Sequence, residues 1–147
     1  MNVRLKFGAR ALFGCLALAS AITGFFVWAK AEYGQAEAVS VAETFLFRLR
    51  SGDYENAFEL TTKNGYVGKT PADLQQFTQR HTCLSGRFVW SSPPQTNGNR
   101  LRRLIRGQSI DMDEVRVEFE GACLLGVSLR RTSDNRWLVY YFASHAG

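Results

Sequence analysis

The hydrophobic positions divide the chain into an uninterrupted apolar run, a segment with helical periodicity and a segment with strand periodicity. The run covers residues 11–29, which carry no formal charge and are long enough to cross a bilayer core as a helix. From Gln35 to Arg50 the apolar residues follow the i, i+3, i+4, i+7 spacing of an amphipathic helix. After about residue 87 they mostly alternate with polar residues, which is typical of strands with one buried face. The pattern predicts a membrane helix followed by one α+β domain.

Capping residues mark the ends of the predicted helices. Gly52 follows the first helix and suits a left-handed cap. Asp53 can cap a second, short helix that continues to about Leu60. Thr70 can cap a third helix, in which Pro71 takes the first position. We therefore expect three helices before the first strand.

The second half of the domain predicts four or five strands. Residues 115–119 alternate between apolar and charged, whereas residues 137–142 are apolar on both faces and predict a central strand. Asn97-Gly98 is typical of a hairpin turn, so the arginine-rich segment 100–106 after it is predicted to be a strand. The remaining strands are expected at residues 87–91 and 123–129. The predicted fold is three helices packed on a curved antiparallel sheet of four or five strands.

The first 31 residues allow three interpretations: an uncleaved signal anchor, a cleaved secretory signal, or a lipoprotein signal ending at Cys15. Residues 29–31 resemble a small-x-small cleavage site, but the apolar core before them is longer than that of a cleavable signal. Too few apolar residues precede Cys15 for a lipoprotein signal core. Core length therefore favours an anchor, although the other two interpretations remain open.

The anchor predicts the organisation of the whole chain. Residues 1–10 carry Arg4, Lys6 and Arg10, and positive charge on this flank favours a cytoplasmic N-terminus. Residues 11–29 form the membrane span, residues 30–34 a linker, and residues 35–147 the folded domain. The expected protein is a single-pass inner-membrane protein with its C-terminal domain in the periplasm.

The net charge of +5 does not indicate nucleic-acid binding. Four of the 18 basic residues lie at or before residue 30, and from Ala31 onward 14 basic residues face 13 acidic ones. The domain is close to neutral, so the excess of basic residues is mainly a topology signal. We expect no nucleic-acid partner.

Two cysteines, Cys83 and Cys123, lie in the predicted domain, and Cys15 lies in the apolar run. Outside the cytoplasm the two domain cysteines are expected to form a disulfide, with buried free thiols as the alternative. Two histidines without metal-ligand spacing complete no recognisable ligand set, so neither a metal nor another cofactor is expected.

The opening of the domain resembles the nuclear transport factor 2-like superfamily, which is also called ketosteroid isomerase-like or cystatin-like. The residues that carry the resemblance are Ala42, Phe45, Leu46, Leu49, Ser51, Gly52, Asp53, Tyr54, Ala57, Phe58 and Leu60. In that superfamily a long helix and two further helices precede a strongly bent antiparallel sheet that forms a cone, so the resemblance implies a cone-like sheet here. The resemblance implies a fold and not an activity, since the superfamily includes enzymes and single-anchor periplasmic scaffold domains.

Superfamily enzymes use a pocket inside the cone, and the resemblance implies four residues that could line one here. They are Tyr54, Tyr66, His81 and Asp111. Tyr66 lies in a glycine-flanked loop and could be a mobile lid, whereas the other three have structural interpretations: packing for Tyr54, a helix end for His81 and a solvated turn for Asp111. No catalytic set can be assigned from the sequence.

The densest charge cluster of the domain is Arg100, Arg102, Arg103 and Arg106. These arginines can protect a sheet edge, dock a protein partner or bind anionic lipid headgroups. We predict a non-enzymatic accessory or scaffold protein whose domain binds an envelope protein or self-associates. The alternative is a small-molecule-binding or isomerase-like enzyme that uses the interior of the cone.

Overall fold

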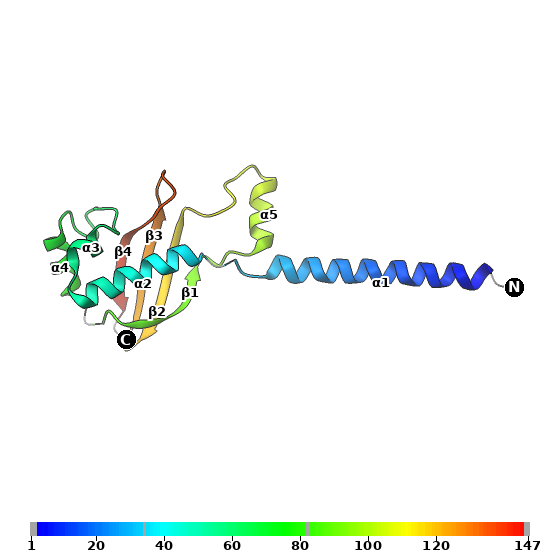
Figure 1. The fold of residues 1–147 in the computed structure, drawn as a ribbon, viewed down its shortest axis with the longest axis horizontal. Helices are drawn as coiled ribbons and strands as arrows, with labels where there is room; N and C mark the ends of the chain where they lie inside the picture. Colours follow the sequence, from blue (N-terminus) through cyan, green and yellow to red (C-terminus); the bar gives the residue numbers. More distant parts are fainter. Residues whose placement is uncertain (1–2, 34, 82, 146–147) are drawn as a thin grey trace. The chain divides into compact units, whose positions relative to one another are not determined.

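The computed structural model describes residues 3–33, 35–81 and 83–145 and divides the chain into two compact units. One unit comprises Met1–Tyr33 and Gln95–Ile110, and the other comprises Gly34–Pro94 and Asp111–Gly147. Figure 1 shows the elements of both units along the chain. An α+β domain and one N-terminal apolar helix are thus confirmed.

The first unit contains helix α1, Val3–Lys30, and helix α5, Asn97–Ile105. Within α1, the segment Phe13–Lys30 is long and apolar enough to cross a membrane, a property that N-terminal signal sequences share. No side chain of residues 13–28 is buried against the rest of the chain.

Helix α5 corrects two predictions. The hairpin at Asn97-Gly98 and the strand at residues 100–106 are wrong, because this segment is helical. Thr96 begins the helix: its side chain accepts a hydrogen bond from the Asn99 N–H at 3.2 Å. The four arginines therefore lie on or at the end of a helix and not on the sheet.

The second unit begins with three helices: α2, Ala36–Ser51; α3, Tyr54–Phe58; and α4, Pro71–Thr78. All three predicted caps are confirmed. Gly52 ends α2 in the left-handed conformation, the Asp53 side chain accepts from the Asn56 N–H, and Thr70 forms a capping box with Asp73. With α5, four helices follow α1 in the described residues, in place of the predicted three.

The sheet is open and antiparallel, and its four strands follow each other in the order β1-β2-β3-β4. They are β1, Gly86–Ser92; β2, Glu114–Gly121; β3, Leu124–Arg131; and β4, Trp137–His145. The prediction that the last strand is central is wrong, because β4 lies at an edge. Part of its outer edge is covered by the loop after α3: the Val139 N–H donates to Leu60 O and the Thr62 N–H donates to Val139 O.

The core lies between α2 and strands β2, β3 and β4. Helix α2 contributes Ala38, Ala42, Phe45, Leu46 and Leu49, which are the apolar stripe read from the sequence. The Phe45 ring meets Phe142 of β4 edge to face, with 5.4 Å between their centroids. The stripe thus fixes which face of α2 covers the sheet.

A disulfide joins Cys83, before β1, to Cys123, in the turn between β2 and β3, as predicted. The two Cα atoms are 6.3 Å apart and the residues are 40 positions apart in the chain. The bond therefore closes a loop that includes β1, α5 and β2.

Candidate binding surface beside strand β1

A groove of about 670 Å³ lies between α2 and β1. Its walls include Leu46 and Phe47 of α2, Phe88 of β1 and Phe119 of β2. Three charged side chains line it as well: Glu43, Arg50 and Arg87. An apolar groove with a few polar groups at its margin is a common form of binding site.

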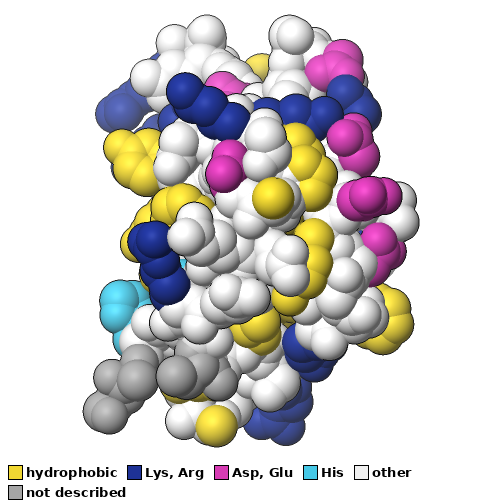
Figure 2. All heavy atoms as spheres, turned by 90° about the vertical axis from the view of Figure 1, so that its left-hand side faces the viewer, with side chains coloured by type: hydrophobic (Ala, Val, Ile, Leu, Met, Phe, Trp, Pro, Cys, Tyr) yellow, Lys and Arg dark blue, Asp and Glu magenta, His cyan; other side chains and the backbone are white. Residues whose placement is uncertain are grey.

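Large apolar side chains are exposed along this side of the unit. In the wall of the groove, Phe47 is 63% exposed and Phe88 is 37% exposed. Trp90 is exposed as well, but it pairs with Glu118 of β2 and therefore lies on the other face of the sheet from Phe119. Exposed apolar side chains in a groove, such as Phe47 and Phe88, are typical of interaction surfaces. On the face seen in Figure 2, by contrast, the hydrophobic side chains form small patches separated by polar groups.

Strand β1 offers backbone groups to a partner as well as side chains. It is an edge strand, paired to β2 on one side only. In the described part of the chain no segment pairs with its other side, whereas the loop after α3 covers part of the corresponding edge of β4. An uncovered edge strand can accept an extended segment of another chain.

The four pocket residues implied by the resemblance lie in different surroundings. Tyr54 is half-buried and lines a shallow groove with α4, whereas Tyr66 is exposed and stacks edge to face on Tyr141 at 6.1 Å. His81 packs against Phe142, and Asp111 is half-buried in the segment between α5 and β2. The structure does not assemble Tyr54, Tyr66 and His81 into one site.

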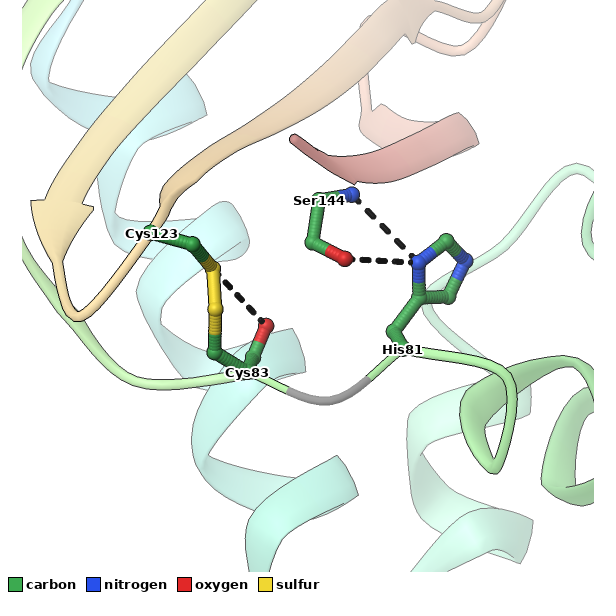
Figure 3. Close-up of a disulfide and its surroundings, with 4 residues drawn as sticks. All are labelled: His81, Cys83, Cys123 and Ser144. Atoms are coloured by element: carbon green, nitrogen blue, oxygen red, sulfur yellow. Dashed lines mark hydrogen bonds between the residues drawn. A yellow bond between two sulfur atoms is a disulfide. The ribbon is translucent and has the colours of Figure 1, made fainter. Parts of the chain in front are cut away.

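His81 has the most defined polar contacts of these residues (Figure 3). Its Nδ1 lies 2.9 Å from Ser144 Oγ and accepts a hydrogen bond from the Ser144 N–H at 3.4 Å. Burial lowers the pKa of His81 below its usual value, which favours the neutral imidazole. A histidine and a serine in contact could transfer a proton, but no acidic side chain is bonded to His81 to complete a triad among the described residues.

The cysteines and acidic residues offer no metal site in the described ranges 3–33, 35–81 and 83–145. No three His, Cys, Asp or Glu side chains come close enough there to hold an ion together. Cys83 and Cys123 are joined to each other, and Cys15 is a free thiol in α1.

The predicted arginine cluster lies on α5, in the first unit. Arg102 and Arg106 are exposed, whereas Arg103 Nε donates to Ser109 O at 2.6 Å. The Arg100 guanidinium lies over the Tyr33 ring, 3.9 Å from its centroid. The arginines therefore belong to a helix that contacts the end of α1, and not to a sheet edge.

Sequence reasoning missed the apolar surface beside β1, although the sequence carries a signal for it. Phe47 lies outside the apolar stripe of α2, so its large side chain has no place in the core. Phe88, Val89 and Trp90 are three consecutive large apolar residues, which cannot all lie on one face of a strand. Both patterns indicate apolar groups left at the surface.

Comparisons with known proteins found no matching family model, no similar curated protein and no similar solved structure. The resemblance to the nuclear transport factor 2-like superfamily therefore stays a prediction.

Proposed function

We propose that the chain is a membrane-anchored accessory protein whose domain binds a protein of the cell envelope through the groove between α2 and β1. The observation that carries this proposal is the combination of an uncovered edge strand with the exposed side chains of Phe47 and Phe88 in the wall of the groove. An extended segment of the partner would pair with the backbone of β1 and insert apolar side chains into the groove. The domain would act by holding that partner at the membrane.

The location of the domain is part of the proposal. Helix α1 supplies a segment able to cross the membrane, and the basic residues before it favour a cytoplasmic N-terminus. The Cys83–Cys123 disulfide supports an oxidising compartment, such as the periplasm, for the domain.

A small-molecule or isomerase-like site inside the domain has less support. Phe45, Phe119 and Phe142 are almost fully buried between α2 and the sheet, where a superfamily enzyme would need open space. The outer groove is therefore the better candidate for binding.

Site-specific photocrosslinking of the full chain in native membranes tests the proposed surface. A photoreactive phenylalanine analogue at position 88, in the wall of the groove, should give a discrete adduct, whereas the same group at the exposed position 79, at the end of α4, should not. In the variant Phe47→Asp, the yield of the adduct should fall severalfold, because a charge in the groove disfavours apolar insertion. Phe47 is exposed, so this change should leave the thermal unfolding midpoint nearly unaltered.

The mass of the adduct identifies the occupant. An adduct that exceeds the 16.5 kDa chain by the mass of another protein supports a separate envelope partner. An adduct of twice the chain mass would show that the occupant is a second copy of this chain and not a separate envelope protein. Equal yields from positions 88 and 79, or a yield unaffected by Phe47→Asp, would contradict binding at this surface.

A further inference from the structure

Helix α5 has an apolar face that nothing in its own unit covers. At a rotation of about 100° per residue, Leu101, Leu104 and Ile105 lie on one side of the helix. Arg102, Arg103 and Arg106 project from the other side. Leu104 is 55% exposed and Ile105 is 77% exposed, so the apolar face has no covering within the described residues. A short helix of this kind is typical of segments that lie in a membrane surface.

The first turn of α5 is fixed to the C-terminal end of α1. Asn97 Nδ2 donates to Trp28 O at 3.2 Å, and the Asn97 N–H donates to Ala31 O at 3.1 Å. Gly98 lies so close to Ala29 that a Cβ there would be only 3.0 Å from the Ala29 carbonyl oxygen. These contacts place α5 at the end of the segment that would leave the bilayer.

The exposed apolar side chains continue the face that meets α1. Leu101 and Ile105 follow Gly98 by three and seven positions, and Leu104 follows Asn97 by seven, so all three lie on the side of these contacts. Figure 1 shows α5 running across the direction of α1. If α1 crosses a bilayer, such a helix lies along the bilayer surface.

The distribution of charge agrees with this placement. Residues 95–110 contain four arginines and no acidic residue, whereas residues 35–94 and 111–147 together contain ten basic and twelve acidic residues. The positive charge of the folded part is thus concentrated in the segment next to the membrane helix. Arginines at the C-terminal end of a helix also suit its dipole, but the dipole does not account for the exposed Leu104 and Ile105.

We infer that α5 binds the surface of the bilayer at the leaflet where α1 ends, with anionic phospholipid as its ligand. Leu101, Leu104 and Ile105 enter the boundary between headgroups and acyl chains, and the arginines bind headgroup phosphates. Nine residues bury too little apolar area for strong binding alone, but attachment to α1 makes the contact intramolecular. The inference rests on the proposed membrane anchor.

Spin labels in the full chain, purified and placed in lipid nanodiscs, test the inference. One label is attached at a time: at the native Cys15, at Ile105→Cys, or at Ser133→Cys, the last two in a Cys15→Ser background that retains the disulfide. Ser133 is the control, because it is exposed in the turn between β3 and β4. Each label is probed by oxygen, which concentrates in lipid, and by a neutral nickel chelate, which stays in water.

In discs that contain phosphatidylglycerol, the labels at positions 15 and 105 should be relaxed mainly by oxygen and the label at position 133 mainly by the nickel chelate. The double change Arg102→Gln and Arg106→Gln should lower the ratio of immersed to aqueous label at position 105 by about fivefold per arginine. Discs of phosphatidylcholine alone should give a similar loss. Leu104→Cys should repeat the result for Ile105→Cys, which excludes an effect of one substitution.

The other outcomes are distinguishable. If the label at Cys15 is aqueous, the membrane anchor fails, and the inference fails with it. If Cys15 is immersed but position 105 is as accessible to nickel as position 133, only the membrane contact of α5 is overturned. If position 105 is shielded from both oxygen and nickel, the apolar face packs against protein, which also overturns binding to lipid.

Discussion

At the scale of single residues, the surroundings of His81 differ from those read in the sequence. A histidine at a helix end would be favoured as a cation by the helix dipole. Helix α4, however, ends at Thr78, and His81 lies beyond it with its ring 5.1 Å from that of Phe142. Because the Ser144 N–H donates to Nδ1, that nitrogen needs a free lone pair, and a protonated ring would lose the hydrogen bond.

The lowered pKa of His81 predicts a pH dependence of stability. The unfolded chain, with an ordinary histidine pKa of about 6.5, binds a proton more readily than the folded chain. The stability contribution of neutral His81 is therefore complete above about pH 6.5 and is lost as the pH falls through the lower folded-state pKa. Urea unfolding of the full chain in detergent between about pH 5 and pH 8 should show this loss on the acid side.

Two variants assign the pH dependence to its residue. His81→Gln should flatten the acid side of the stability curve, because the amide does not titrate. His145→Gln is the matched control, because His145 is exposed at the end of β4; this variant should keep the acid-side loss that His81→Gln removes. If the stability of His81→Gln falls on the acid side as much as that of the unmodified chain, groups other than His81 cause the loss.

At the scale of elements, the sequence predicted those whose signals are local. The stripe and cap of α2, the Asp53 cap of α3 and the Thr70-Pro71 start of α4 are all found in the structure. Segment 97–106 was misread because Arg100, Arg102 and Arg106 alternate as on a strand, and Asn97-Gly98 is typical of a hairpin. The spacing of Leu101, Leu104 and Ile105 at i, i+3 and i+4 was the signal for a helix.

The order of strands and the candidate surface could not be predicted in the same way. Strand β4 is apolar on both faces, which suggested a central position, yet it lies at an edge whose outer side is partly covered by the Leu60–Thr62 loop. Which edge stays uncovered depends on contacts between segments far apart in the chain. The groove beside β1 exists only because α2 and β1 lie side by side in the fold, and the sequence does not show that contact.

The cap between α2 and α3 gives a prediction at this scale. Gly52 has a φ of 75°, in the region that costs a residue with a Cβ about 1 kcal/mol or more. Gly52→Ala should therefore lower the free energy of unfolding by about 1 kcal/mol, as measured by urea denaturation. Gly65→Ala is the control, because Gly65 has no positive φ and no heavy atom within 4 Å of the added Cβ. Equal effects of the two changes would contradict a special role for the left-handed cap.

At the scale of the whole molecule, the N-terminal helix and the disulfide are linked through the compartment of the domain. The disulfide closes a loop between residues 40 positions apart, which stabilises the fold by about 4 kcal/mol on the chain-entropy model. That contribution exists only where thiols are oxidised. If α1 carries the domain out of the cytoplasm, removal of the helix should also remove the disulfide.

Thiol counting in intact cells tests this link. Cells are quenched in acid, and denatured extracts are treated with a maleimide polymer that adds a fixed mass to each free thiol. The full chain should gain one addition, at Cys15, because Cys83 and Cys123 are joined. A variant that lacks residues 1–30 also lacks Cys15, yet it should gain two additions, because its domain stays in the reducing cytoplasm. Three additions to the full chain would place the domain in a reducing compartment and contradict the proposed topology, whereas no addition would indicate that the segment containing Cys15 is cleaved.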